Sequence, residues 1–161
     1  MKFLKYAFPL MLALLFTLAV AACAQQPNVP TPATGGSTQT TTGGSNALLH
    51  TATATVKGAS KTILTNAQGM TLYYRTSDKP PSVVCSGGCA GAWPPLLFTG
   101  SGAPTSSAQL PGKLTVVVDA NGNQVEYNGH PLYTFASDSA PGQTNGEGVG
   151  NIWFVATPDL T

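Results

Sequence analysis

The pattern of hydrophobic and polar positions predicts short β-strands along the second two thirds of the chain. Residues 51–56 and 114–118 are rich in Thr and Val and lead into turn residues, as the first strands of hairpins do. Residues 124–127 alternate between polar and apolar side chains, and Asn128-Gly129 is a strong hairpin signal before residues 131–135. The matching segments of the first half are residues 62–65, 66–69 and 71–75. No segment shows a helical hydrophobic period, so the pattern predicts an all-β fold made of β-meanders.

The landmarks of these strands recur at a spacing of 60 residues. Eight positions between residues 69 and 93 carry the same residue 60 positions later, whereas unrelated segments would share about one or two. The pairs are Gly69/Gly129, Leu72/Leu132, Tyr73/Tyr133, Ser77/Ser137, Asp78/Asp138, Pro81/Pro141, Gly88/Gly148 and Trp93/Trp153. Two copies of one structural unit explain the recurrence. We therefore predict two tandem repeats, about 50–110 and 111–161, packed as one domain.

Each copy carries a long Gly-rich loop between its Asp and its Trp, and loops of that length usually hold a functional site or a staple. The last strand of copy two is expected over residues 152–156. In copy one, Trp93 is followed by Pro94-Pro95, which cannot donate ladder hydrogen bonds. Copy one is therefore expected to end on an edge or to leave the sheet there.

The N-terminal segment, residues 1–22, has the features of an export signal. Lys2 and Lys5 precede an apolar run that is too short for a stable membrane span. The run ends in Val20-Ala21-Ala22-Cys23, which resembles the bacterial lipobox. That resemblance implies that Cys23 becomes the first mature residue and receives a thioether-linked diacylglycerol. Ordinary secretion with cleavage near Ala22 is the alternative.

A lipidated Cys23 would make the protein a membrane-anchored, extracytoplasmic lipoprotein, because two or more acyl chains anchor lastingly. Ala24 stands where an Asp would resemble an inner-membrane retention signal. The outer membrane is therefore expected if the source has two membranes. Residues 23–46 are dominated by Gln, Pro, Thr, Gly and Ser with no periodic apolar pattern, so they are expected to form a flexible tether before a β domain at 47–161.

The low charge content and net charge of the chain limit the classes of partner that we expect. Charged residues make up 8% of the chain. Removal of Lys2 and Lys5 from the seven basic residues leaves five against six acidic ones, a net charge of about −1. No basic face for nucleic acid is predicted. The expected partners are the membrane, through the lipid anchor, and an envelope protein or glycan that the sequence does not identify.

The segment Tyr133-Thr134-Phe135-Ala136-Ser137-Asp138 matches the signature Y-x-[FWY]-x-x-D. Residues 50 to 158 resemble the bacterial secreted-repeat lipoproteins named for this motif, also in Cys85-x-x-x-Cys89-Ala90 and in the following Trp93-Pro94-Pro95. Copy one departs from the signature, since Arg75 stands where an aromatic is expected. The resemblance implies an exported, lipid-anchored repeat domain without an assigned biochemical activity. The repeat-motif residues are Leu72, Tyr73, Asp78, Trp93, Leu132, Tyr133, Phe135, Asp138 and Trp153.

Cys85 and Cys89 are the only cysteines besides Cys23, and an exported location favours their oxidation. Copy two has Asn145 and Val149 at the equivalent positions, which excludes a redox mechanism shared by both copies. We predict a structural disulfide that stabilises the fold by on the order of 2 kcal/mol.

The alternative for this cysteine pair is a metal site. A C-x-x-x-C pair with a His resembles the copper site of the Sco-type assembly proteins. Met70 and His130, which are equivalent in the two copies, would supply a thioether and an imidazole, and soft sulfur with imidazole suits copper.

The recurring aromatics Tyr73, Tyr133, Trp93 and Trp153 are predicted to form the repeat's own core, with a stacking platform for a sugar or a flat cofactor as the alternative. Asp78 and Asp138 are predicted to accept backbone N–H groups and fix the loops that follow them. As alternatives, the two carboxylates would form an acid/base pair or, with Glu147, a calcium site.

The sequence favours a non-catalytic role. The only histidines are His50, at the tether boundary, and His130. Ser137-Asp138 near His130 is not a triad signature, because proximity in sequence does not position a nucleophile against a base. We expect an envelope structural or binding module without a cofactor. The alternative is a redox or copper-handling accessory protein.

Overall fold

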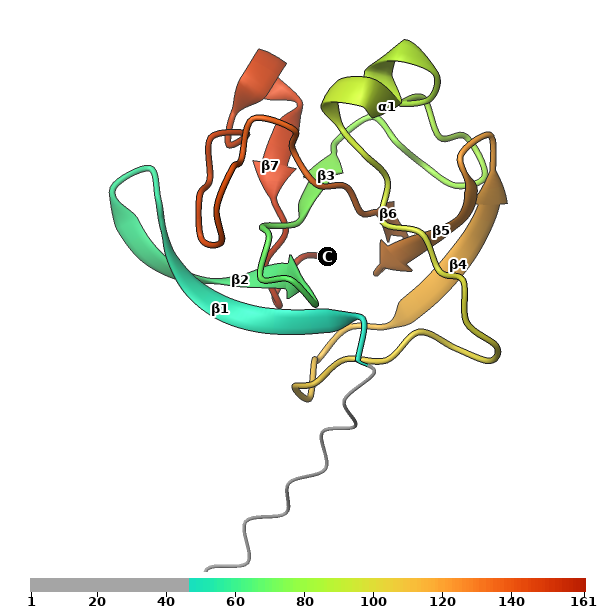
Figure 1. Cartoon of the computed structure of the whole chain (residues 1–161), viewed down its shortest axis with the longest axis horizontal. Helices are drawn as coiled ribbons and strands as arrows, with labels where there is room; N and C mark the ends of the chain where they lie inside the picture. The colour runs from blue at the N-terminus through green and yellow to red at the C-terminus, as the bar shows by residue number, and fades with distance from the viewer. Residues whose placement is uncertain (1–46) are drawn as a thin grey trace, which may run out of the picture. The chain divides into compact units, whose positions relative to one another are not determined.

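The structure, a computed structural model, describes residues 47–161, and Figure 1 shows their arrangement. The predicted signal peptide, Cys23 and the tether lie outside the described residues. The strands are β1 (Leu49–Val56), β2 (Ala59–Asn66), β3 (Tyr73–Arg75), β4 (Leu114–Asp119), β5 (Gly122–Tyr127), β6 (His130–Pro131) and β7 (Trp153–Val155). The described part of the chain contains only two short helical turns, so the predicted all-β class is confirmed.

Two long hairpins, β1-β2 and β4-β5, lie on opposite sides of the molecule in Figure 1. They are the same element of the two repeats, and in each a first strand rich in β-branched residues runs into a two-residue turn. The predicted Asn128-Gly129 turn is also present and joins β5 to β6. Both residues have a positive φ, 50° for Asn128 and 77° for Gly129, which Asn and Gly tolerate best.

The ends of the two repeats cross over. β7 of copy two pairs antiparallel with β3 of copy one, so that Trp153 lies opposite Arg75. The segment after Trp93 makes the equivalent crossing in single bridges, Pro95 with Tyr133 and Leu97 with Gln124. Copy one therefore does not leave the sheet at its prolines, because the Pro94 carbonyl accepts a hydrogen bond from Thr134 N–H over 2.8 Å. The two repeats are interlocked rather than placed side by side.

The helical turns α1 (Gly88–Ala92) and η1 (Val149–Asn151) occupy equivalent places in the two Gly-rich loops. Neither was expected from the sequence. A turn of three to five residues is too short to produce a detectable hydrophobic period. No helix in residues 47–161 has the length and apolar character needed to cross a membrane.

The buried side chains form two clusters, and each contains residues of both repeats. One gathers Leu72 and Leu132 with the other leucines, and the second gathers the recurring tyrosines and tryptophans. Leucine and tyrosine are neighbours in sequence, so they face opposite sides of the central strands. Residues 71–78 and 131–138 have the same order of buried and exposed positions throughout. Because each cluster needs both copies, neither repeat has a core of its own.

Candidate functional site

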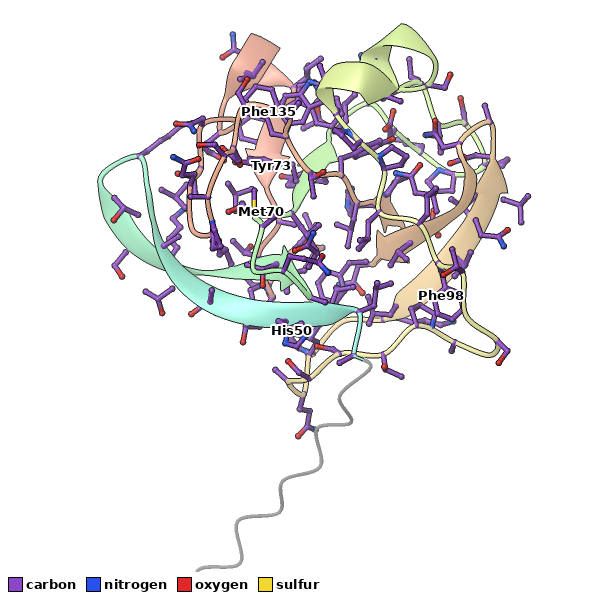
Figure 2. All side chains as sticks on the ribbon, in the orientation of Figure 1. His50, Met70, Tyr73, Phe98 and Phe135 are labelled. Atoms are coloured by element: carbon purple, nitrogen blue, oxygen red, sulfur yellow. A yellow bond between two sulfur atoms is a disulfide. The ribbon has the colours of Figure 1, made fainter. Side chains whose placement is uncertain are left out.

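The centre of the molecule is a pair of equivalent tyrosines. Tyr73 N–H donates to Tyr133 O over 2.8 Å, and Tyr133 N–H donates to Tyr73 O over 2.9 Å. Both side chains are fully buried. A reciprocal bond between residues 60 positions apart places an approximate twofold axis between them. In Figure 2, Tyr73 lies in the middle of the molecule with Phe135 nearby, whereas His50 lies at the lower edge.

Each tyrosine hydroxyl donates to the carboxylate of the other copy. Tyr73 Oη donates to Asp138 Oδ2 and Tyr133 Oη donates to Asp78 Oδ2, both over 2.6 Å. Burial, followed by the hydrogen bond to the carboxylate, raises the pKa of both tyrosines far above their usual range. Both phenols therefore remain neutral donors at physiological pH. The crossed pairs join the two repeats through bonds to a charged acceptor, which are stronger than neutral ones.

The second oxygen of each carboxylate anchors the loop that follows it. Asp78 Oδ1 accepts from Val84 N–H and Asp138 Oδ1 accepts from Asn145 N–H, each over 3.0 Å. These are the backbone contacts predicted for the two Asp residues. The tyrosine partners of these carboxylates were not predicted from the sequence, although the signal was present. A Tyr followed five residues later by an Asp in both copies makes reciprocal pairing possible wherever a twofold axis relates the copies.

The two tryptophans stack on each other beside the tyrosines. The rings of Trp93 and Trp153 are 3.9 Å apart between centroids and inclined by 4°. Tyr73 meets Trp93 edge to face at 5.4 Å, and Tyr133 meets Trp153 in the same way at 5.0 Å. Trp93 is 5% and Trp153 4% exposed, so the rings pack in the core and do not form an open platform. The four aromatics occupy matching surroundings in the two copies.

The stack is extended at each end by the third position of the motif. Phe135 stacks on Trp93 with centroids 4.2 Å apart, and the guanidinium carbon of Arg75 lies 6.0 Å from the Trp153 ring centroid. Arg75 thus keeps the place of the expected aromatic, because a guanidinium also binds to a ring face. Its Nη1 is 3.4 Å from Asp78 Oδ1, so the substitution adds an ion pair to copy one.

The Gly-rich loops are held differently in the two copies. A disulfide joins Cys85 and Cys89 in copy one. In copy two, Glu147 accepts from Val155 N–H over 2.8 Å and forms an ion pair with Lys57 at 3.2 Å. Gly146 of this loop approaches the core so closely that a Cβ there would lie 2.8 Å from ring atoms of Trp93 and Tyr73.

The residues of the copper alternative do not form a recognisable site. Within residues 47–161, no group of three or more His, Cys, Asp or Glu side chains is placed to hold a metal. The sulfur atoms of Cys85 and Cys89 are bonded to each other. The antiparallel pairing of Tyr73 with Tyr133 carries Met70 and His130 to opposite sides of the axis.

His130 has neighbours of its own. Its ring lies against Tyr74 at 5.1 Å between centroids, and its Nε2 is 3.2 Å from Thr161 O.

Two surface depressions lie near the C-terminal residues 157–161, one beside Lys61 and one beside Gly112. Neither is lined by a residue of the repeat motif.

Comparison with known families supports the division into two copies. A family model described as a secreted repeat of unknown function matches residues 54–97 and 115–157, together more than half of the chain. The two matched segments coincide with the two interlocked units. No curated protein and no solved structure matches the chain.

Proposed function

Because this chain belongs to the family of secreted repeats of unknown function, we propose that it is an exported, lipid-anchored lipoprotein with a non-catalytic structural or binding role in the cell envelope. The family description supports a location outside the cytoplasm. The cysteine pair agrees with that location, since disulfides persist in oxidising compartments.

The observation that carries the non-catalytic role is that the recurring carboxylates are buried and hydrogen-bonded inside the core. A catalytic acid or base must come within hydrogen-bond reach of a substrate. Asp78 and Asp138 are buried residues, 1% and 6% exposed, and the carboxylate of each accepts a hydrogen bond from a buried tyrosine. The recurring tyrosines and carboxylates therefore hold the copies together, and the carboxylate oxygens are bonded to the tyrosines and to the loops that follow them.

The proposal of a lipid anchor rests on the lipobox-like segment before Cys23, which lies outside the described residues. Lipid on Cys23 would attach the β domain to a membrane, and residues 24–46 would separate the domain from its surface. Ala24 stands where an Asp would resemble an inner-membrane retention signal, which supports the outer membrane where the source has two membranes.

The test is metabolic labelling of the full chain in a bacterium that processes lipoproteins, with an alkyne-bearing fatty acid as the label. The expected result is label on the N-terminal peptide that begins at Cys23, together with recovery of the protein in the membrane fraction. Cys23→Ser is the matched control and should remove both the label and the membrane recovery. A mature N-terminus at Ala24 or at an earlier residue that carries no fatty-acid label would show an ordinary secreted protein.

A further inference from the structure

The outer edge of β4 is unpaired within the described part of the chain. The sheet order is β4-β5-β6, so β5 covers only one side of β4. Val125 N–H donates to Leu96 O, and Asn123 O accepts from Phe98 N–H, both over 2.8 Å, so these β5 groups point away from β4. Their register partners Val116 and Val118 must then point their own N–H and C=O away from β5. By the same alternation along the strand, Leu114 also points its N–H and C=O away from β5.

This edge is apolar and unprotected. Val118 is 76% exposed, and Leu114, Val116 and Val117 are partly exposed. Natural edge strands are usually blunted by Lys, Pro or a bulge, because a free edge pairs readily with another chain. No charge, Pro or Gly interrupts the strand between Lys113 and Asp119.

The equivalent edge of copy one is contacted at both of its ends. Leu49 N–H donates to Thr105 O over 3.2 Å at the start of β1, and Thr144 Oγ1 donates to Thr55 O over 2.8 Å near its end. The contrast shows that the free edge of β4 is a property of this strand and not of the repeat unit.

We propose that β4 pairs antiparallel with β4 of a second copy of this chain, with Val116 on the twofold axis of the dimer. Leu114 then lies opposite Val118 of the second copy, and Val116 lies opposite Val116. All three residues present outward N–H and C=O groups, so all three pairs exchange two hydrogen bonds. The three-stranded sheets of the two copies join into one.

Charge complementarity selects this register. With Val116 on the axis, Lys113 lies opposite Asp119 of the second copy at both ends of the pair, and opposite charges in facing positions stabilise a sheet. A shift by one residue places outward groups opposite inward ones. A shift by two residues loses hydrogen-bonded pairs and separates Lys113 from Asp119. The interface uses the same patch on both copies, as twofold interfaces do.

The test is thiol cross-linking of the full chain in membranes of the expressing cells, with Val116→Cys and Val118→Cys as the compared variants. Directly opposite residues have Cβ atoms about 5 Å apart, within reach of a short bifunctional thiol reagent. Two copies of Val118 are offset by four residues, roughly 13 Å along the strands. We expect several-fold more covalent dimer from Val116→Cys than from Val118→Cys. The parent chain measures any contribution from Cys23.

Exposure alone predicts the opposite order, because Val118 is the more exposed position. Equal cross-linking at the two positions, more at Val118, or none above the parent would overturn the proposal.

A second measurement does not depend on the new cysteines. Two differently tagged full-length copies should co-purify from solubilised membranes, and Lys113→Glu should reduce the recovered partner several-fold by placing two acidic groups opposite each other. Adding Asp119→Lys to Lys113→Glu should restore recovery. Resistance to proteolysis equal to that of the parent identifies the variants that fold. Folded Lys113→Glu that co-purifies as the parent does would refute the register.

Discussion

The crossed tyrosine–carboxylate pairs can be tested by removing one hydroxyl at a time. Tyr73→Phe keeps the ring but leaves Oδ2 of Asp138, a residue that is 6% exposed, without its donor. It also removes the acceptor of Gly146 N–H, which lies 3.3 Å from Tyr73 Oη. A hydrogen bond to a charged group contributes about 1.5 to 3 kcal/mol, and a buried charge left unsatisfied costs toward the upper end. We expect Tyr73→Phe to lower the free energy of unfolding by about 2 to 3 kcal/mol.

Tyr133→Phe should cost less, although the two positions are equivalent. Asp78 Oδ1 also lies 3.4 Å from Arg75 Nη1, so its charge keeps a cationic neighbour when the phenol is removed. The position equivalent to Arg75 in copy two is Phe135, which offers Asp138 no such compensation. We expect a loss of about 1 to 2 kcal/mol for Tyr133→Phe.

The assay is urea-induced unfolding of residues 24–161 at pH 7, followed by tryptophan fluorescence. Trp93 and Trp153 are buried in one stack, so their emission reports loss of the core that both repeats share. A loss of under about 0.5 kcal/mol for both variants, the size of an ordinary surface change, would refute the structural role of the pairs. A larger loss for Tyr133→Phe than for Tyr73→Phe would refute the role given to Arg75.

Three further predictions concern pH, the disulfide and one glycine. The pKa of Tyr73 is raised by burial, so the folded state keeps a proton that the unfolded state releases at alkaline pH. The contribution of this tyrosine to the free energy of unfolding is complete below about pH 10 and declines above it by about 1.4 kcal/mol per pH unit. When the free energy of unfolding is measured at increasing alkaline pH, it should fall less steeply for Tyr73→Phe than for the parent. The difference in slope should correspond to one proton. Replacing Cys85 and Cys89 together by Ala should lower the free energy of unfolding by about 2 kcal/mol, measured by the urea midpoint, and an unchanged midpoint would contradict a stabilising staple. Gly146→Ala should cost about 1 to 3 kcal/mol through overpacking against the core rings, whereas Gly91→Ala, with open space around it, should cost nothing; similar effects of the two would argue against the close approach.

The repeat, the all-β class and the main hairpins were accessible from the sequence because they depend on local patterns. Runs of β-branched residues form strands, and Asn128-Gly129 forms a turn, through interactions between near neighbours. The spacing of 60 residues identified the two copies, and the aromatic motif identified their family. The helical turns in the Gly-rich loops were not predicted, because they are too short to show a helical hydrophobic period.

The structure was needed to show which copy supplies each partner. A pattern along one chain states that Tyr73 and Asp78 recur as Tyr133 and Asp138, but both pairing within a copy and pairing between copies satisfy that pattern. The role of Arg75 was hidden for the same reason, since its ring partner Trp153 belongs to the other copy.

The amino-acid sequence alone was enough to identify a duplicated β-repeat chain, because strand patterns, turn residues and repeat spacing are local or periodic properties. Three features became visible only in three dimensions: the copies exchange their last strands, tyrosine bonds to aspartate across an axis, and the outer edge of β4 has no partner within residues 47–161. Those features arise from contacts between residues distant in sequence, and the registers that bring them together are set by the packing of both copies at once.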